Sequence, residues 1–198
     1  MPRESAFTLD ELTERALQQF WFHGFNATSM DALVKSTGVS RHGIYSAFGG
    51  KKQIFHACFD RYQDLVVTPA FDPVEAPDAN LGSIAEYFET QISLGDAHGL
   101  PGPGCFVANS STEMAPHDAK TKEAVAKHNA RLRAGFENAL HNERRNRQLT
   151  SQMNCAGLAE VCVIFTNGLW SMSRVTSQAD DLRTAFKTFL LTIEDALT

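Results

Sequence analysis

The sequence predicts an all-α protein. Apolar residues recur at spacings of three and four in one segment after another, and glycine or proline separates these segments. No stretch of useful length alternates polar and apolar residues as a strand would. The 198 residues are enough to bury a core without disulfides or metals. We expect a small amino-terminal domain at 1–50 and a larger helical domain at 51–198, which begins with a connecting helix at 51–67.

The first helix is predicted from its spacing and its cap. Apolar residues from Leu9 to Trp21 have helical spacing, Thr8 is a suitable N-cap, and Glu11 follows three residues later as in a capping box. Gly24 is expected to end this helix in the left-handed αL conformation.

Three more short helices are expected directly afterwards. Thr28 or Ser29 is predicted to cap a second helix that ends near residue 37, and Ser40 to cap a third that ends near residue 48. Gly49-Gly50 then breaks the chain before a fourth helix at about 51–67. Turns of a few residues between such helices indicate a compact helical head.

The remaining segments are predicted to be helical too. Three prolines between residues 68 and 78 predict an irregular connection, because proline lacks the N–H that a helix interior needs. A flexible loop rich in glycine and proline is expected at 95–104. The further helices are expected at about 81–94, 105–114, 118–147, 152–175 and 179–197.

The segment from Thr28 to Lys51 is the most informative part of the sequence. Two short helices folded about Gly38-Val39-Ser40 make a helix-turn-helix, which places its second helix in the major groove of DNA. The segment resembles the tetracycline-repressor (TetR) family of bacterial transcription regulators. The matching positions are Thr28, Ser29, Met30, Gly38, Val39, Ser40, Ile44, Tyr45, Phe48 and Lys51. This resemblance implies a three-helix DNA-binding domain followed by a ligand-binding and dimerisation domain.

Several residues of the motif are candidates for contacts with double-stranded DNA. Arg41 and His42 lie at the start of the third helix, where such side chains meet base edges, and Arg41 is suited to guanine or phosphate. Tyr45 offers its hydroxyl to a phosphate or its ring to a thymine methyl group. Lys51 and Thr28 are expected at helix starts that bind phosphate. The complete predicted set is Thr28, Ser29, Ser40, Arg41, His42, Gly43, Tyr45 and Lys51.

Gly43 and Val34 depart from the family pattern. Gly43 stands where many members have threonine, and glycine inside a helix costs about 1 kcal/mol relative to alanine. Val34 stands where the family usually has alanine. The operator sequence therefore cannot be copied from relatives.

The net charge of −5 does not exclude a nucleic-acid partner, because binding uses one small face. Between residues 28 and 58, Lys35, Arg41, Lys51 and Lys52 outnumber the lone acid, Asp31. The sequence shows no signal peptide, no apolar run of bilayer length and no zinc-type cysteine spacing. We expect a cytoplasmic protein without cofactor or metal, with its four cysteines reduced.

The resemblance implies that the last two helices pair with those of a second copy. A homodimer would read a palindrome, because one short helix reads too few bases alone. Intramolecular core packing is the alternative interpretation of the same apolar residues. The candidate dimer residues are Leu158, Val161, Cys162, Phe165, Leu169, Phe186, Phe189, Leu190 and Ile193.

The resemblance also implies a pocket for a small-molecule inducer in the larger domain, with repression as the family default. Cys105 follows Gly102-Pro103-Gly104 and opens a helix, where a helix dipole lowers the pKa of a thiol. It resembles a Gly-Cys-x-x-x-Asn segment of some members that sense electrophiles or oxidants. Simple packing is the alternative role. The candidate ligand or sensing residues are Phe88, Gln91, Ile92, Cys105, Phe106, Asn109, Glu113, Phe136, Phe165 and Trp170.

Two rival functions remain open at this point. Cys105 with His98 or His117 would be the nucleophile and base of a cysteine-dependent hydrolase or transferase, although no acid or oxyanion loop stands out. A helical adaptor that does not bind DNA is the other alternative. We expect a regulator rather than an enzyme.

Overall fold

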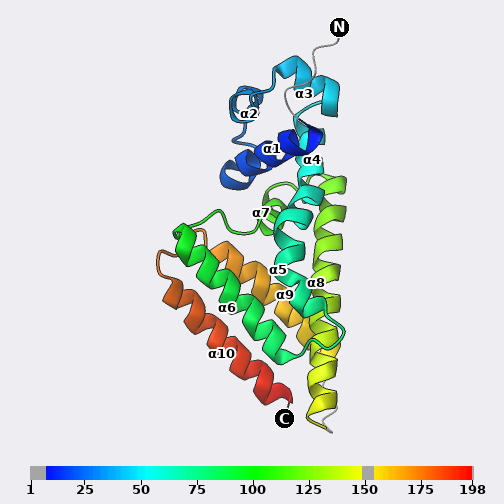
Figure 1. Ribbon diagram of the computed structural model, residues 1–198, viewed down its shortest axis with the longest axis vertical. Helices are drawn as coiled ribbons and strands as arrows, with labels where there is room; N and C mark the ends of the chain where they lie inside the picture. The colour runs from blue at the N-terminus through cyan, green and yellow to red at the C-terminus, as the bar shows by residue number, and fades with distance from the viewer. Residues whose placement is uncertain (1–7, 149–153, 198) are drawn as a thin grey trace. The chain divides into compact units, whose positions relative to one another are not determined.

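The computed structural model describes residues 8–148 and 154–197, and within them every regular element is a helix, as predicted (Figure 1). The elements are α1 (Leu9–His23), α2 (Met30–Thr37), α3 (Arg41–Phe48), α4 (Lys51–Tyr62), the π-helix η1 (Gln63–Val67), α5 (Thr68–Glu75), α6 (Leu81–His98), α7 (Phe106–Glu113), α8 (Ala119–Asn146), α9 (Cys155–Met172) and α10 (Ala179–Leu197).

The chain forms two compact units. Among the described residues, unit 1 contains 8–67 and 106–125, and unit 2 contains 68–105, 126–148 and 154–197. Unit 1 extends beyond the boundary predicted at residue 50, because α4 and α7 share the core of the first three helices. The segment 106–125 returns to unit 1 from the middle of the chain.

The start of α1 matches its prediction, and its end differs in detail. The N–H of Glu11 donates to Thr8 Oγ1 over 3.2 Å, and the N–H of Thr8 donates to the Glu11 carboxylate over 2.8 Å. This reciprocal pair is the expected capping box. Gly24 ends the helix, but its φ of 81° and ψ of 170° are not αL. The extended ψ directs the next backbone N–H groups toward a side chain of α7.

Aromatic rings form the core of unit 1. The ring of Phe55, on α4, lies 5.2 Å from Phe20 of α1, 5.0 Å from Phe25 and 5.5 Å from Phe106 of α7. Phe20, Phe55 and Phe106 are at most 1% exposed. Edge-to-face pairs of this kind add to the free energy gained by burial alone. They fix α1, α4 and α7 as one body.

The irregular connection predicted at residues 68–78 is wrong over most of its length. The backbone remains helical through η1 and α5 as far as Glu75. Pro69 is the second residue of α5, and Pro73 lies inside α5 on its exposed side. The five-residue π-helix just before shifts the hydrogen-bond register, which is how helices accommodate such irregularities.

Unit 2 packs α5, α6, α8, α9 and α10 around Phe88. The Phe88 ring lies 4.8 Å from Phe186 of α10 and 6.2 Å from Phe136 of α8. Gly135 of α8 is needed here, because a Cβ atom at this position would lie 2.7 Å from the Phe71 ring. Helix α6 runs to His98, so the predicted loop begins at Gly99 instead of Gly95. The predicted start of the penultimate helix, near Gln152, lies outside the described residues.

Candidate nucleic-acid interface

The predicted helix-turn-helix is formed by α2 and α3. Ser29 caps α2 by accepting the N–H of Ala32 over 3.0 Å, and Ser40 caps α3 by accepting the N–H of Gly43 over 3.1 Å. Gly38 ends α2 with φ 73° and ψ 6°, the left-handed conformation that glycine adopts most easily. The two helices are therefore joined by a tight turn with defined ends.

Helix α3 exposes three of the predicted DNA-contact residues on its surface. Arg41, His42 and Tyr45 are exposed, and the Tyr45 side chain is 51% exposed. On the opposite side Ile44 is fully buried, and Phe48 is half-buried. We call Arg41, His42 and Tyr45 the reading face.

Gly43 has a packing reason for being glycine. A Cβ atom there would lie 2.7 Å from Cγ1 of Val39, in the turn. A methyl group at this distance forces Val39 to move. The close approach of Val39 therefore accounts for glycine at a position where many family members have threonine.

Arg41 already has an acidic neighbour within the motif. Its Nη2 donates to Oδ1 of Asp31 over 2.7 Å, joining the first turn of α3 to the first turn of α2. This hydrogen bond, followed by the charge of Asp31, raises the pKa of Arg41. The guanidinium keeps its remaining N–H groups for other partners.

Thr28 and Lys51 hold a loop instead of presenting themselves on the surface. Thr28 is fully buried, and its hydroxyl donates to the carbonyl of Gly24 over 2.7 Å. Lys51 Nζ donates to the carbonyls of Phe25 and Thr28, each over 2.8 Å, and lies 4.1 Å from the centre of the Phe25 ring. Partial burial lowers the pKa of Lys51. The expected phosphate contact of Thr28 is corrected, and that of Lys51 loses its support.

Glu113 binds the other side of the same loop. Its two carboxylate oxygens accept the N–H groups of Phe25 over 2.9 Å and Asn26 over 2.8 Å. The predicted ligand-orienting role of Glu113 is therefore corrected, since both oxygens bind backbone. Lys51 and Glu113 together hold the carbonyls and the N–H groups of the loop between α1 and α2. Lys51 and Phe25 are 26 residues apart, and Glu113 and Phe25 are 88 apart, so no local sequence pattern could predict these contacts.

A buried carboxylate joins α4 to the start of α8. Asp118 accepts from Lys52 Nζ over 2.5 Å, from His56 Nε2 over 2.6 Å, and from the N–H and hydroxyl of Thr121 over 3.0 and 2.7 Å. Lys52, then Thr121 and His56, hold the pKa of Asp118 well below its usual range despite burial. We did not predict this cluster, although an Asp three residues before a helical Thr is an N-cap signal.

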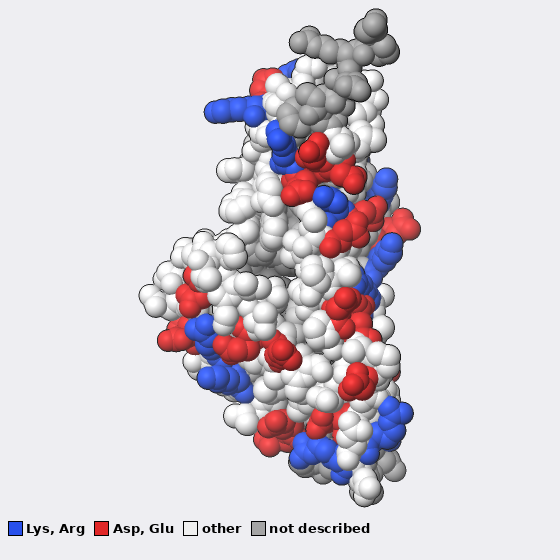
Figure 2. Space-filling view, in the orientation of Figure 1, with Lys and Arg blue, Asp and Glu red and all other residues white. Residues whose placement is uncertain are grey.

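On the face shown in Figure 2, acidic and basic side chains are interspersed instead of forming large areas of one sign. Among the described residues, no group of three or more His, Cys, Asp or Glu side chains is placed to hold a metal ion.

The predicted ligand residues are divided between the two units. Phe106, Asn109 and Glu113 belong to unit 1, where Phe106 packs against Phe55 and against Phe59 at 4.9 Å. The others belong to unit 2, and there Phe88, Ile92 and Phe136 are fully buried against neighbouring side chains. The structure does not bring the predicted set together within one unit. The remaining members of the unit 2 group are Gln91, Cys105, Phe165 and Trp170.

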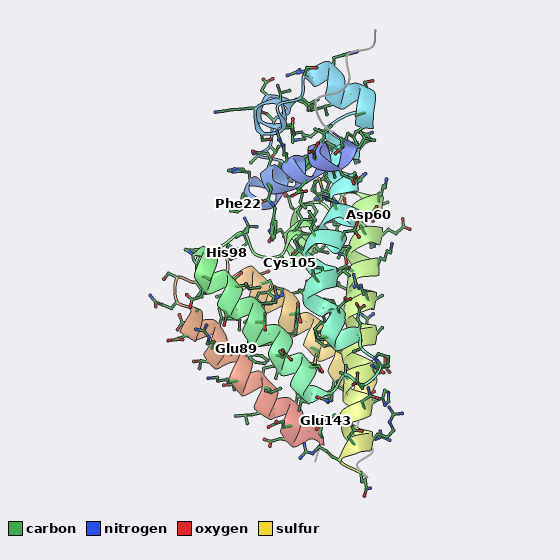
Figure 3. The ribbon with its side chains drawn as sticks, viewed as in Figure 1. Phe22, Asp60, Glu89, His98, Cys105 and Glu143 are labelled. Atoms are coloured by element: carbon green, nitrogen blue, oxygen red, sulfur yellow. The ribbon has the colours of Figure 1, made fainter. Side chains whose placement is uncertain are left out.

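Cys105 immediately precedes α7 and is 7% exposed (Figure 3). The preceding residue, Gly104, has a φ of 69°, and a Cβ atom there would lie 2.7 Å from the Trp170 carbonyl. Close packing against α9 thus fixes the chain next to Cys105. Tyr87 is buried nearby: burial raises its pKa, a hydrogen bond with Trp170 lowers it, and the neighbouring Cys105 raises it.

The other three cysteines are buried packing residues. Cys58, Cys155 and Cys162 are at most 2% exposed. Burial raises the pKa of Cys162 to about 12 and that of Cys58 further. A thiol of this kind is a poor nucleophile at neutral pH.

The predicted dimer residues divide into three classes: half-buried, buried and, for Val161 alone, exposed. Phe165 and Phe189 are half-buried and stack on each other at 3.9 Å within one chain, and Leu158 and Leu190 are also half-buried. Four residues are at most 4% exposed in the single chain, which corrects their assignment to an intermolecular surface. These four are Cys162, Leu169, Phe186 and Ile193.

An apolar strip of α9 does face outward. Val161, Ile164 and Met172 are 46%, 64% and 54% exposed, and Gly168 between them has no heavy atom within 4 Å of its Cβ position. We call these four residues the α9 strip. By length and composition alone α9 is the one described helix apolar enough to cross a membrane, and 33% of it is buried. Of the four residues of the α9 strip, only Val161 is among the predicted dimer residues.

Comparison with known proteins identifies both parts of the chain. Residues 12–58 match the family described as bacterial regulatory proteins, tetR family. Residues 81–189, more than half of the chain, match the tetracyclin repressor-like C-terminal domain.

Two curated relatives are regulators of the helix-turn-helix type. The transcriptional repressor ComR of Escherichia coli is 30% identical over 115 residues, which is 58% of this chain and 54% of ComR. The chain therefore matches about half the length of ComR. The transcriptional regulator YezE of Bacillus subtilis is 23% identical over 185 residues, 92% of this chain and 94% of YezE.

Solved structures show the same fold. A cysteine mutant of the TetR-family regulator CifR, complexed with 26-bp double-strand operator DNA, has 20% identity and a TM-score of 0.77, with 98% of each chain covered. A TetR-family regulator from Cytophaga hutchinsonii has 15% identity and a TM-score of 0.82, covering 96% of this chain and 98% of that one. The reduced form of E. coli NemR has 20% identity and a TM-score of 0.78, with 94% of both covered. With both of its parts matched by domains of one family, the chain belongs to the TetR family of bacterial regulatory proteins.

Proposed function

We propose that this transcription regulator binds a palindromic DNA operator as a homodimer and represses transcription until a small molecule releases it. The observation that carries the proposal is the reading face: Arg41, His42 and Tyr45 are exposed on a helix whose other side is buried. The CifR structure with operator DNA supports DNA as the partner. We place the protein in the cytoplasm, where its DNA is, and propose that it acts by binding instead of catalysis.

The second copy is proposed to cover the α9 strip. Contiguous exposed apolar surface on a soluble protein marks an interaction site. Gly168 at the centre of the strip would let a partner helix come close, because a Cβ atom there would meet no heavy atom within 4 Å. A second copy would bury the exposed apolar side chains of α9, so its apolar composition does not require a membrane. Two reading faces about one DNA turn apart would then match a palindrome.

Backbone phosphates are proposed to position the dimer. Ser29 and Ser40 use their oxygen atoms as caps, and each hydroxyl retains a proton to donate to phosphate. Gly50 is the N-cap of α4 and offers no side-chain cap, so the first N–H groups of the helix suit an anion. Such contacts fix register and carry little sequence information.

Arg41→Ala is expected to weaken binding to the DNA that flanks the protein's own gene by about 10- to 100-fold, because a base-edge contact of arginine contributes about 1–3 kcal/mol. Fluorescence anisotropy at several salt concentrations measures this. The wild type should show a steep salt dependence from release of counterions.

Lys122→Ala is the charge-matched control, since Lys122 is exposed on α8 and outside the reading face. It should bind nearly as the wild type does. Equal losses in the two variants would show that charge alone, and not the reading face, is responsible. Absence of salt-sensitive binding by the wild type would contradict the proposed function.

The inducer site is proposed to lie in unit 2, around the aromatic side chains of α6, α8 and α9 and the Tyr87–Trp170 pair. Pockets are usually apolar with a few polar groups, and these residues have that composition. A sensing role of Cys105 stays a prediction. NemR was solved in a form described as reduced, which makes thiol chemistry a reasonable second hypothesis for this chain.

A further inference from the structure

We propose that Asp31 is a positioning residue for Arg41 and raises the preference of the protein for its operator over other DNA. This inference rests on the proposed function. Asp31 Oδ1 accepts from Arg41 Nη2 over 2.7 Å, and both side chains are exposed, Asp31 by 85% and Arg41 by 58%. An ion pair this exposed contributes little to folding. Because Asp31 binds a residue of the reading face, we assign the pair a role in DNA binding.

The contact restrains the guanidinium without consuming it. Arginine has five N–H donors in a planar fork, and Asp31 takes one hydrogen of Nη2. The second hydrogen of Nη2 and the Nη1 group remain for the paired acceptors of a guanine edge. A side chain held in advance loses less conformational freedom on binding. Asp31 therefore favours the DNA sequences that present a matching base to Arg41.

The charge of Asp31 has the opposite effect on every sequence. It is the lone acid between residues 28 and 58, so it repels phosphate whichever DNA is bound. It also competes with phosphate for Arg41. Lys51 and Lys52, by contrast, point to partners inside unit 1, namely loop carbonyls and Asp118. General repulsion combined with restraint of one base-reading group lowers non-specific binding more than specific binding.

The test compares wild type with Asp31→Asn on two DNA probes. One is a duplex selected from a random pool by the wild-type protein, and the other is the same duplex with the selected bases scrambled. We expect Asp31→Asn to bind the scrambled duplex several-fold more tightly and to lose about 10-fold in the ratio of the two affinities, as for a weakened base contact. Asp31→Glu, which keeps the carboxylate, should retain most of the ratio.

Asp60→Asn is the matched control, because Asp60 is an exposed acid on α4 of the same unit (Figure 3). It removes the same charge away from Arg41 and should leave the ratio unchanged. The fall in ratio should also disappear when Asp31→Asn is made in the Arg41→Ala protein.

Two results would overturn the inference. The first is an equal ratio of the two affinities for Asp31→Asn and Asp60→Asn, which would show that Asp31 acts only through its charge. The second is a fall in ratio that persists without Arg41. Failure of the wild type to select any sequence would instead contradict the proposed function itself.

Discussion

Ile164→Glu is expected to turn the proposed dimer into a monomer and to weaken operator binding by at least about 100-fold, equivalent to about 2.7 kcal/mol. Ile164 has the most exposed side chain of the three apolar residues of the α9 strip, at 64%. In a two-fold interface the substitution buries two carboxylates, one from each copy, without a cation to pair with them. A monomer has one reading face, so it loses half of the contacts with a palindrome.

Sedimentation velocity gives the oligomeric state and fluorescence anisotropy gives the affinity. Ala130→Glu serves as control, because Ala130 is an exposed position on α8 and receives the same charge. The control should remain dimeric. An Ile164→Glu protein that is still dimeric and binds DNA normally would show that the copies meet elsewhere.

Asp118→Asn is expected to lower the free energy of unfolding by about 3 kcal/mol at pH 7. The carboxylate is buried and accepts four hydrogen bonds, from Lys52, His56 and Thr121. Hydrogen bonds to a charged group contribute about 1.5–3 kcal/mol each, and the half-exposed Lys52 recovers part of its loss from water. Urea unfolding measures the change.

The effect should depend on pH in a defined direction. The folded pKa of Asp118 is lowered, so its contribution is complete above the unfolded-state pKa of about 3.9 and is lost as the pH falls below that value. The difference between the wild type and Asp118→Asn should therefore be full at pH 7 and begin to shrink as the pH falls below about 3.9. Glu123→Gln, at an exposed position of the same helix, should change little at either pH. A difference that stays constant from pH 7 to pH 3 would contradict an ionised Asp118.

Local chemistry was predictable from the sequence. Thr8 and Glu11 form the expected capping box, Ser29 and Ser40 cap the two helices of the motif, and Gly38 makes the turn. Each of these signals acts within three or four residues of chain. For the same reason the element types and most helix ends were predicted correctly.

Features that depend on distant partners were not predictable. Glu113 and Lys51 bind a loop far away in sequence, and nothing local distinguishes them from surface charges. Helix α9 is apolar on several sides, so spacing alone could not separate the buried Cys162 and Leu169 from the exposed Ile164 and Met172. The helix also continues through Pro69 and Pro73 after the π-helix η1, which has no simple sequence signature.

The central claim is that α3 reads DNA in the context of a two-fold dimer. Hydroxyl-radical footprinting on the DNA that flanks the protein's own gene tests it most directly. We predict one protected region made of two inverted half-sites about 10 base pairs, or a multiple of that, apart. Arg41→Ala should lose the protection at concentrations where the wild type is saturated. Protection of a single unpaired site, or protection spread evenly along the DNA at every concentration, would contradict the claim.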